Sequence, residues 1–319
     1  MFDVIVSFGV IEHTEHPVEY LANALSLLKV GGSIFLETDN HDDWIARLDL
    51  EFRSTGGRTV LVRNHHYGPL CVQKPFYPEG HDFPHVYLIH PPGGIVSGDR
   101  LDISISLNSG SKPLITTPGA GRFYRARTRN SLQKQSVDLT LGHNSKLEWF
   151  PLETILFNGA NAETDTTIPL TEGSMFIGWE ICCFGMPASK QDFSKGSFLQ
   201  RYIISIDNIP AFVDVLDLRG GLQEMLVGKA GMQSKSVTGF LLMGPTTEDF
   251  EDELDNLRRH AGLNHFETSF SLSKVGEFLV GRYLGDSADA AKKIFTHCWT
   301  VMRPRILRRQ ACLPRIWFT

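Results

Sequence analysis

Short runs in which apolar and polar residues strictly alternate constrain this fold more than any other feature. Three examples are "ARLDLEF" (46–52), "LDISISL" (101–107) and "SVDLTL" (136–141). Because successive side chains of a β-strand point to opposite faces, this period buries one face of a sheet and leaves the other in water. Similar runs, separated by Gly, Pro, Asn and Ser, continue from residue 46 to about 240. The pattern predicts a β-rich body of half-buried antiparallel strands.

Two helices are predicted after these strands. Residues 246–263 have acids in the first turn, basic residues in the last turn and Gly262 at the end, which suits the helix dipole. Residues 286–303 begin with Asp286 or Ser287 as the N-cap. Each helix carries an apolar stripe, so we expect both to pack on the β-rich body. The stripes are Phe250, Leu254, Leu257 and Ala261 in the first helix, and Ala291, Ile294, Phe295, Cys298, Trp299 and Met302 in the second.

The first 43 residues have a different character. A strand over 2–8, a helix over 17–29 and a strand over 33–38 form one β-α-β unit. The pieces "FDVIVSFGVIEHTEHPVEYL", "LLKVGG" and "SIFLETDN" resemble the second half of a class I S-adenosylmethionine-dependent methyltransferase. That family holds its cofactor with a Gly-rich turn and an acid, both of which would precede Met1. We therefore expect residues 1–43 to be a truncated, non-functional fragment, either a real fusion or an artefact of the gene model.

Charge and cysteine content narrow the classes of function. The 319 residues include 31 Lys and Arg against 36 Asp and Glu, a net charge of −5, so no nucleic-acid partner is expected. No apolar run approaches the roughly 20 residues that span a bilayer, so no membrane association is expected either. The five cysteines are an odd number and include no CxxC pair. They indicate reduced thiols and a cytoplasmic location rather than disulfides or structural zinc.

Two glycine-containing segments are candidate functional loops. "HPPGGIVSGDR" (90–100) has two glycines at the spacing of a phosphate-binding loop, but Asp99 and Arg100 replace the Lys and the Ser or Thr that bind phosphate and magnesium. We interpret it as a tight turn between strands. "TTPGAGRFYRA" (116–126) places arginines next to aromatic residues. This segment is either a partner-binding surface or a strand with buried aromatics.

Because no catalytic motif is found, the remaining candidates are metal ligands. His81 and His85 are a weak candidate pair, whereas His85 and His90 would point to opposite faces of one strand. Three glutamates lie in apolar strands, where a carboxylate is usually paired. Alternatively, they line a passage for a cation, because oxygen ligands suit hard and borderline ions. These three are Glu148, Glu153 and Glu180.

An ordered series of motifs covers most of the remaining chain. It runs from "WIARLDLEF" and "HYGPLCVQKPFYPEG" through "HVYLIHPPGGIVSGDRL", "LITTPGAGRFYRA" and "LEWFPLETILFNGA" to "GWEICCFGMPAS", "LVGRYLGD" and "LPRIWFT". On these motifs, residues 44–319 resemble the UreD (UreH) family of urease accessory proteins. "LRRQAC" (307–312) departs from the usual Gly-Arg-Pro-like segment of that family. The family motif is carried by His90, Pro91, Pro92, Gly93, Gly94, Gly98, Asp99, Arg100, Thr117, Pro118, Gly119, Phe123, Tyr124 and Arg125.

The resemblance implies a fold, a role and a set of partners. The expected fold is mainly β, with two packed, largely antiparallel sheets and a few C-terminal helices. The expected role is that of a non-enzymatic scaffold in urease maturation, which binds the urease apoprotein and a UreF-type protein. Through the latter it recruits a UreG-type GTPase, which hydrolyses the GTP. Nickel is expected to be handled only transiently, with no tightly bound cofactor. A methyltransferase remnant and a β-rich binding module unrelated to nickel are the alternatives.

Overall fold

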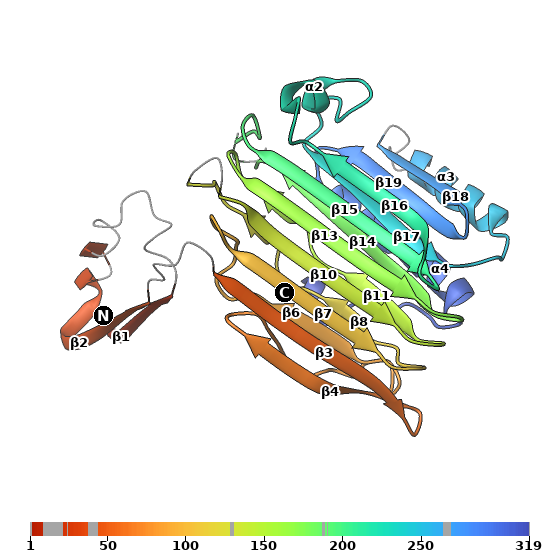
Figure 1. The fold of residues 1–319 in the computed structure, drawn as a ribbon, viewed down its shortest axis with the longest axis horizontal. Coiled ribbons are helices and arrows are strands. Elements are labelled where there is room, and N and C mark those ends of the chain that lie inside the picture. The colour runs from red at the N-terminus through yellow and green to blue at the C-terminus, as the bar shows by residue number, and fades with distance from the viewer. Residues whose placement is uncertain are drawn as a thin grey trace. The chain divides into compact units, whose positions relative to one another are not determined.

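The structure, a computed structural model, divides into two compact units, residues 1–44 and 45–319. It describes residues 2–8, 22–23, 25–37, 44–127, 131–186, 189, 191–263 and 269–318. Figure 1 shows the helices and strands of both units, which are treated separately below.

The first unit pairs two parallel strands. β1 (Phe2–Phe8) lies beside β2 (Leu28–Glu37). Residues 22, 23, 25 and 26 are helical, whereas residues 17–21 and 24 of the predicted helix lie outside the described residues. The predicted end of this helix is wrong, because Leu28 and Lys29 belong to β2. Leu28 fits the apolar period of the helix and also that of the following strand, so the apolar stripe could not determine where the helix ends.

Two β-sheets build the second unit. One has seven strands in the order β16-β15-β13-β10-β7-β3-β4. The other has ten strands, in the order β18-β19-β17-β14-β11-β8-β6-β5, with β12 paired to β14 and to β9. The seven-stranded sheet comprises β3 (Ile45–Thr55), β4 (Arg58–Tyr67), β7 (Arg100–Leu107), β10 (Gln133–Leu141), β13 (Asn161–Leu170), β15 (Ser197–Ile206) and β16 (Ile209–Asp217). The ten-stranded sheet comprises β5 (Cys71–Val72), β6 (His85–Ile89), β8 (Leu114–Thr116), β9 (Gly121–Phe123), β11 (Lys146–Phe150), β12 (Thr154–Leu156), β14 (Met175–Phe184), β17 (Val237–Gly244), β18 (Phe270–Val275) and β19 (Phe278–Gly285).

The chain winds alternately through the two sheets. β7, β10, β13 and β15 lie in the seven-stranded sheet, while β8, β11 and β14, which come between them along the chain, lie in the ten-stranded sheet. Between two neighbouring strands of one sheet, the chain therefore returns through a strand of the other sheet. As a result, these neighbouring strands pair in parallel. Figure 1 shows the long strands of both sheets lying along a common direction.

The prediction of largely antiparallel sheets is wrong for this central part. Antiparallel pairs occur on either side of it, between β3 and β4, β15 and β16, β14 and β17, β17 and β19, β18 and β19, and β5 and β6. Alternation of apolar and polar residues indicates that one face of a strand is buried. The same pattern arises whether the neighbouring strand is parallel or antiparallel. The rest of the prediction is confirmed, because the fold is mainly β with two packed sheets and a few C-terminal helices. All three alternating segments form strands.

Both faces of the ten-stranded sheet are buried. Along β14, Phe176 and Cys182 belong to the core between the two sheets, whereas Trp179 and Cys183 belong to a second core. α3 (Glu251–Leu263) and α4 (Ala288–Ile306) cover this second core, with α4 in contact with β14, β17, β19 and α3. The described residues also include α2 (Leu222–Val227) and a 3₁₀ helix (Arg315–Phe318). A residue's place in the alternation therefore decides whether it meets the other sheet or the helices.

Both predicted helices form, and their apolar stripes are buried in the second core. Ser287 is the N-cap of α4, and its hydroxyl accepts a hydrogen bond from the Ala290 N–H at 3.2 Å. α3 begins at Glu251 rather than at residue 246, and Asp249 accepts the Glu251 N–H at 3.1 Å at this start. Among the helices of the described residues, none has both the length and the apolar character that a membrane crossing needs.

Candidate functional site

Glu180 is the predicted carboxylate that faces the space between the two sheets. The alternation of β14 places it on the same face as Phe176 and Cys182. The Trp149 indole N–H donates a hydrogen bond to Glu180 Oε1 at 3.3 Å, and burial raises the pKa of Glu180 to about 7. Its neighbours on this face, Gly178 and Cys182, are buried, yet Glu180 keeps some accessible surface. A water-sized space therefore adjoins a carboxyl group that is only partly ionised at neutral pH.

Other polar groups line the same space from the opposite sheet. Tyr202 on β15 is fully buried, and its hydroxyl has no hydrogen-bond partner among the described residues. Burial, and then the charge of Glu180, raise the pKa of Tyr202. Gln200 on the same strand donates to Cys182 Sγ at 3.5 Å. Buried hydroxyls without a protein partner are commonly satisfied by water, so this part of the core is suited to hold water.

A cavity of about 230 Å³ opens between the sheets at the two candidate loops. His90, Gly93 and Arg122 line it near the loops, and Gln135 and Trp149 line it farther inside. Burial lowers the pKa of His90 to about 4, so its imidazole is neutral at physiological pH. Trp149 lines the cavity and also donates to the inward-facing carboxylate described above, so this one side chain contacts both.

The segment 90–100 forms the predicted tight turn between β6 and β7. Gly93 and Gly98 have positive φ angles of 75° and 84°, which residues with a side chain rarely adopt. Asp99 Oδ2 accepts the Val96 N–H at 3.0 Å, so this acid closes the turn instead of facing a ligand. In the neighbouring loop, Thr117 Oγ1 accepts the Leu152 N–H at 2.9 Å. These hydrogen bonds hold both loops in place at the walls of the cavity.

The aromatic residues of segment 116–126 are packed against the protein. Phe123 is buried, and the ring of Tyr124 lies against Phe157 with centroids 4.9 Å apart. This packing favours the buried-strand alternative for the aromatic residues. Arg125 is exposed and lines a basic hollow on the surface with three further cations. These are Arg127, Lys195 and Arg219.

Glu148 lies on the other face of the ten-stranded sheet, beneath α4. The Trp299 indole N–H donates to Glu148 Oε1 at 2.5 Å, and the Arg303 guanidinium donates to both oxygens at 2.7 to 3.1 Å. Arg303 also binds Glu79, with Nη1 2.6 Å from Oε2. Burial opposes the charge of Arg303, but the two carboxylates outweigh it and raise the pKa of Arg303. Glu148 therefore follows the paired alternative of the two that its sequence context allowed.

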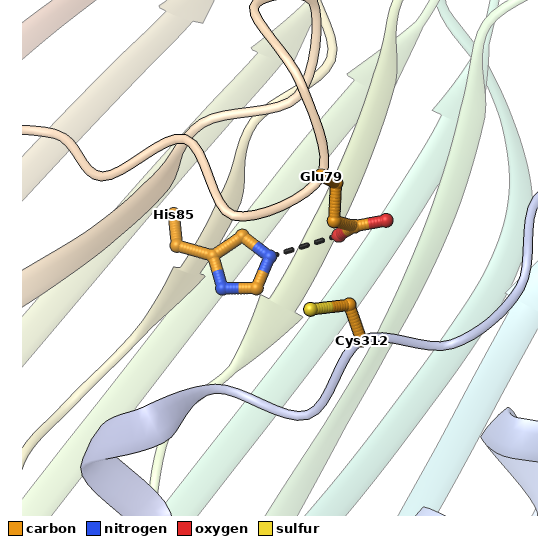
Figure 2. A group of neighbouring side chains, drawn as sticks. All are labelled: Glu79, His85 and Cys312. Carbon is orange, nitrogen blue, oxygen red and sulfur yellow. Dashed lines mark hydrogen bonds and ion pairs between the residues drawn. The ribbon is translucent and has the colours of Figure 1, made fainter.

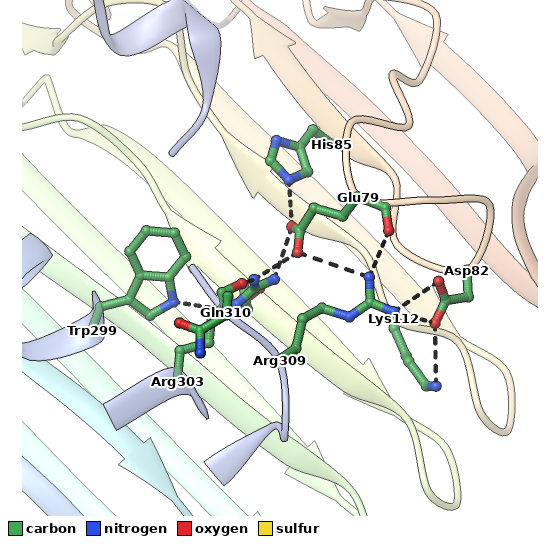
Figure 3. A network of polar contacts seen from close by, with 9 residues as sticks. Glu79, Asp82, His85, Lys112, Trp299, Arg303, Arg309 and Gln310 are labelled. Carbon is green, nitrogen blue, oxygen red and sulfur yellow. Dashed lines mark hydrogen bonds and ion pairs between the residues drawn. The ribbon is translucent and has the colours of Figure 1, made fainter. Parts of the chain in front are cut away.

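The ion-pair network continues from Glu79 towards the surface, as Figure 3 shows. Arg309 donates to the Glu79 carbonyl at 2.7 Å and to both oxygens of Asp82 at 2.8 and 2.9 Å, and Lys112 lies 3.7 Å from Asp82. Burial raises the pKa of Glu79, but hydrogen bonds from His85 and Arg303 outweigh it and hold that pKa below its usual value. This network ties the segment after α4 to the loop before β6.

The remaining predicted ligands lie apart from Glu180. His85 is buried on the helix-covered face of β6, where Nε2 is 2.8 Å from Glu79 Oε1. His81 is exposed, and its ring lies 6.2 Å from that of Tyr77. Glu153 lies before β12, and its charge adds to burial in raising the pKa of Cys183 to about 12. The structure therefore gathers neither the three glutamates nor His81 and His85 into one site.

Comparison with known sequences decides the family of this chain. The family model described as "UreD urease accessory protein" matches residues 45–318. The chain belongs to the UreD family. The UreD protein of Marinomonas sp. (strain MWYL1) is 40% identical over 283 residues, which cover 86% of this chain and 90% of that protein. UreD of Psychromonas ingrahamii is 38% identical over 293 residues (87% and 95%), and UreD of Klebsiella aerogenes is 38% identical over 276 residues (86% and 97%).

Membership of the UreD family confirms the resemblance carried by the motif series. The relatives are named urease accessory proteins rather than urease, which supports a role in urease maturation. The matched residues coincide with the second compact unit, so the sheets, the cavity and both carboxylate environments belong to the UreD part of the chain.

Sequence reasoning missed Arg303, although a signal was present. Arg303 follows Trp299 by four residues and so falls on the apolar stripe of α4, where a cation must find a carboxylate. Glu79 was missed because its partner Arg303 is 224 residues away in the sequence. Tyr202 alternates with apolar residues in β15, and nothing in the sequence marks its hydroxyl as unpaired.

Proposed function

We propose that this chain is a scaffold for urease maturation that passes nickel to the urease apoprotein in the cytoplasm. In this proposal, a UreF-type protein binds the scaffold and recruits a UreG-type GTPase, which hydrolyses the GTP. Nickel is cargo, so the chain holds no permanent cofactor. The inter-sheet cavity and the space beside Glu180 together form the passage for the ion.

The environment of Glu180 carries this proposal. Glu148 is fully buried and Trp299 and Arg303 bind both of its oxygens, so a passing metal ion cannot reach it. Glu180 receives one long hydrogen bond from Trp149 and adjoins a water-sized space. Because its pKa is about 7, it exchanges a proton for a cation at little cost near neutral pH. Weak, reversible contact of this kind suits an ion in transit better than storage.

Complementation tests the role in a strain that produces the urease apoprotein but lacks its own UreD-type protein. We expect the full chain to restore urease activity and to co-purify with a UreF-type protein. The variant Glu180→Gln removes the charge and keeps the shape, so we expect lower nickel content in urease with UreF-type binding retained. Glu172→Gln is the matched control, because the Glu172 side chain is 88% exposed.

Two results would contradict different parts of the proposal. Failure of the full chain both to restore urease activity and to bind the UreF-type protein would exclude the scaffold role. Restoration that is equal for Glu180→Gln and Glu172→Gln would remove Glu180 from the passage while leaving the role intact.

A further inference from the structure

Three different metal-binding side chains converge outside the proposed passage. The ligand atoms of Glu79, His85 and Cys312 all lie within 4.8 Å of one another. Figure 2 shows the Cys312 thiol and the Glu79 carboxylate directed towards the His85 ring. In β6, Val86 and Leu88 belong to the core between the sheets, whereas His85 lies on the opposite, helix-covered face. This cluster is therefore separate from Glu180.

Each of the three side chains is held from a different part of the chain. His85 begins β6, and its backbone exchanges hydrogen bonds of 2.7 and 2.9 Å with Phe76. Glu79 lies in the preceding loop, where Arg309 binds its carbonyl at 2.7 Å. Cys312 lies after α4, two residues beyond Gln310, whose carbonyl accepts a hydrogen bond from Arg303. The separations between the ligand atoms are thus set by the ion-pair network and not by a flexible terminus.

Arg303 orients Glu79 without covering all of its carboxylate. Nη1 of Arg303 binds Oε2 at 2.6 Å, whereas Oε1 accepts from Arg303 Nη2 at 2.9 Å and faces His85 Nε2 at 2.8 Å. A cation between Nε2 and Oε1 would replace the proton that these two atoms share and would leave the Oε2 contact in place. Such hydrogen bonds behind a ligand fix its direction in known metal sites.

We infer that Glu79, His85 and Cys312 bind a borderline divalent cation such as Co²⁺, Ni²⁺ or Zn²⁺. One imidazole nitrogen, one thiolate and one carboxylate oxygen are donors that ions of this series accept together, whereas Mg²⁺ and Ca²⁺ require oxygen ligands. Three protein ligands leave a fourth tetrahedral position open. The site would bind more weakly than a structural zinc site, because Arg303 and Arg309 place two positive charges beside Glu79.

The site has an entry path from the surface. A hollow of about 480 Å³ is lined by Tyr77, His85, Tyr87 and Leu313, the residue after Cys312. Cys312 is itself only half-buried. The hollow therefore brings a hydrated ion as far as His85, and the thiol of the half-buried Cys312 lies within 4.8 Å of the His85 ligand atom.

Titration of the full-length, reduced and metal-free chain with Co²⁺ tests the site. A thiolate ligand gives Co²⁺ an intense charge-transfer absorption that surface histidines and carboxylates do not produce. We expect this absorption to saturate at one Co²⁺ per chain. X-ray absorption of the Zn²⁺-loaded chain should show one sulfur at about 2.3 Å together with nitrogen and oxygen ligands. Neither measurement depends on urease activation, so failure here is distinct from failure of the proposed function.

Cysteine variants assign the thiolate. Cys312→Ser should abolish the charge-transfer absorption and weaken Co²⁺ binding at least tenfold. Cys71→Ser is the matched control, because Cys71 is the other half-buried cysteine and should leave both measurements unchanged. His85→Asn should weaken binding while the sulfur signal persists. The inference is overturned if Cys312→Ser keeps the absorption, or if the wild-type Zn²⁺ spectrum contains no sulfur, in which case Glu79 serves only its ion pair with Arg303.

Discussion

Two glutamates that look alike in the sequence have opposite surroundings in the structure. Glu148 and Glu180 both lie among apolar residues on strands of the ten-stranded sheet. Glu148 faces the helices and is neutralised by Arg303. Glu180 faces the other sheet, beside the Tyr202 hydroxyl, which no described residue pairs with. Because both faces of this sheet are buried, hydrophobic patterning could not tell which way either carboxylate points.

The raised pKa of Glu180 predicts a specific pH dependence of stability. In the unfolded chain this carboxyl loses its proton near pH 4.5, but in the folded protein it keeps the proton up to about pH 7. The free energy of unfolding therefore decreases as the pH rises from 4.5 to 7, by about 3 kcal/mol, and is constant above that range. Glu180→Gln removes this dependence, so at pH 8 we expect it to be more stable than the wild type by up to about 3 kcal/mol.

Denaturant unfolding of both proteins at pH 5 and at pH 8 measures this difference. The gain should be much smaller at pH 5, where the carboxyl group of the folded protein is protonated. Glu172→Gln, at an exposed position, should show no gain at either pH. A gain from Glu180→Gln that is equal at the two pH values would contradict the assigned pKa.

Gly94 is required because of a close approach by Tyr124. A Cβ atom at residue 94 would lie 2.2 Å from Cε2 of the Tyr124 ring, whereas a Cβ atom at Gly119 would meet nothing within 4 Å. We expect Gly94→Ala to lower the free energy of unfolding by about 1 to 3 kcal/mol, and Gly119→Ala to cause no loss. Denaturant midpoints measure both effects. If the clash is the cause, Gly94→Ala should cost much less in a Tyr124→Ala background.

At the scale of elements, α4 is attached to the sheet by both packing and charge. Its apolar stripe fills the second core, and Arg303 places its cation between Glu79 and Glu148. The apolar stripe could be predicted from the helical period. The ion pair could not, because its partners lie on a loop and a strand that no local pattern connects to the helix.

Replacing Arg303 should loosen this attachment. Arg303→Met removes the guanidinium that two buried carboxylates share, so we expect a loss of about 3 to 5 kcal/mol in the free energy of unfolding. Arg305→Met is the matched control on the same helix, because Arg305 is 56% exposed and its pair with Glu253 should contribute at most about 1 kcal/mol. Equal losses in thermal or denaturant unfolding would show that burial of the Arg303 pair adds nothing.

The direction of the strands was also beyond the sequence. Segments 101–107 and 136–141 were correctly assigned as strands, and their apolar positions are buried. β7 and β10 nevertheless pair in parallel, because the chain crosses back through the other sheet between them. A hairpin is marked in the sequence by its turn residues. A crossing between two sheets has no such local signature, because recognising it requires knowing which sheet each strand belongs to.

At the scale of the whole molecule, the chain consists of two compact units with different sequence character. The family match begins at residue 45, where the second unit begins. We expect deletion of residues 1–43 to leave the melting temperature of the second unit and urease activation unchanged, because both sheets and both cores lie beyond the deletion. Thermal unfolding and complementation measure the two properties. Loss of activation with folding intact would assign a function to the first unit.

The buried charge pair described above also has a consequence for synthesis on the ribosome. Arg303 follows Glu79 by 224 residues and Glu148 by 155. At the usual rate of elongation, Glu79 waits roughly 10 to 45 seconds before its cation is made. A nascent chain that stops before α4 therefore exposes two carboxylates and an apolar sheet face together. This pair can close only after α4 has been made.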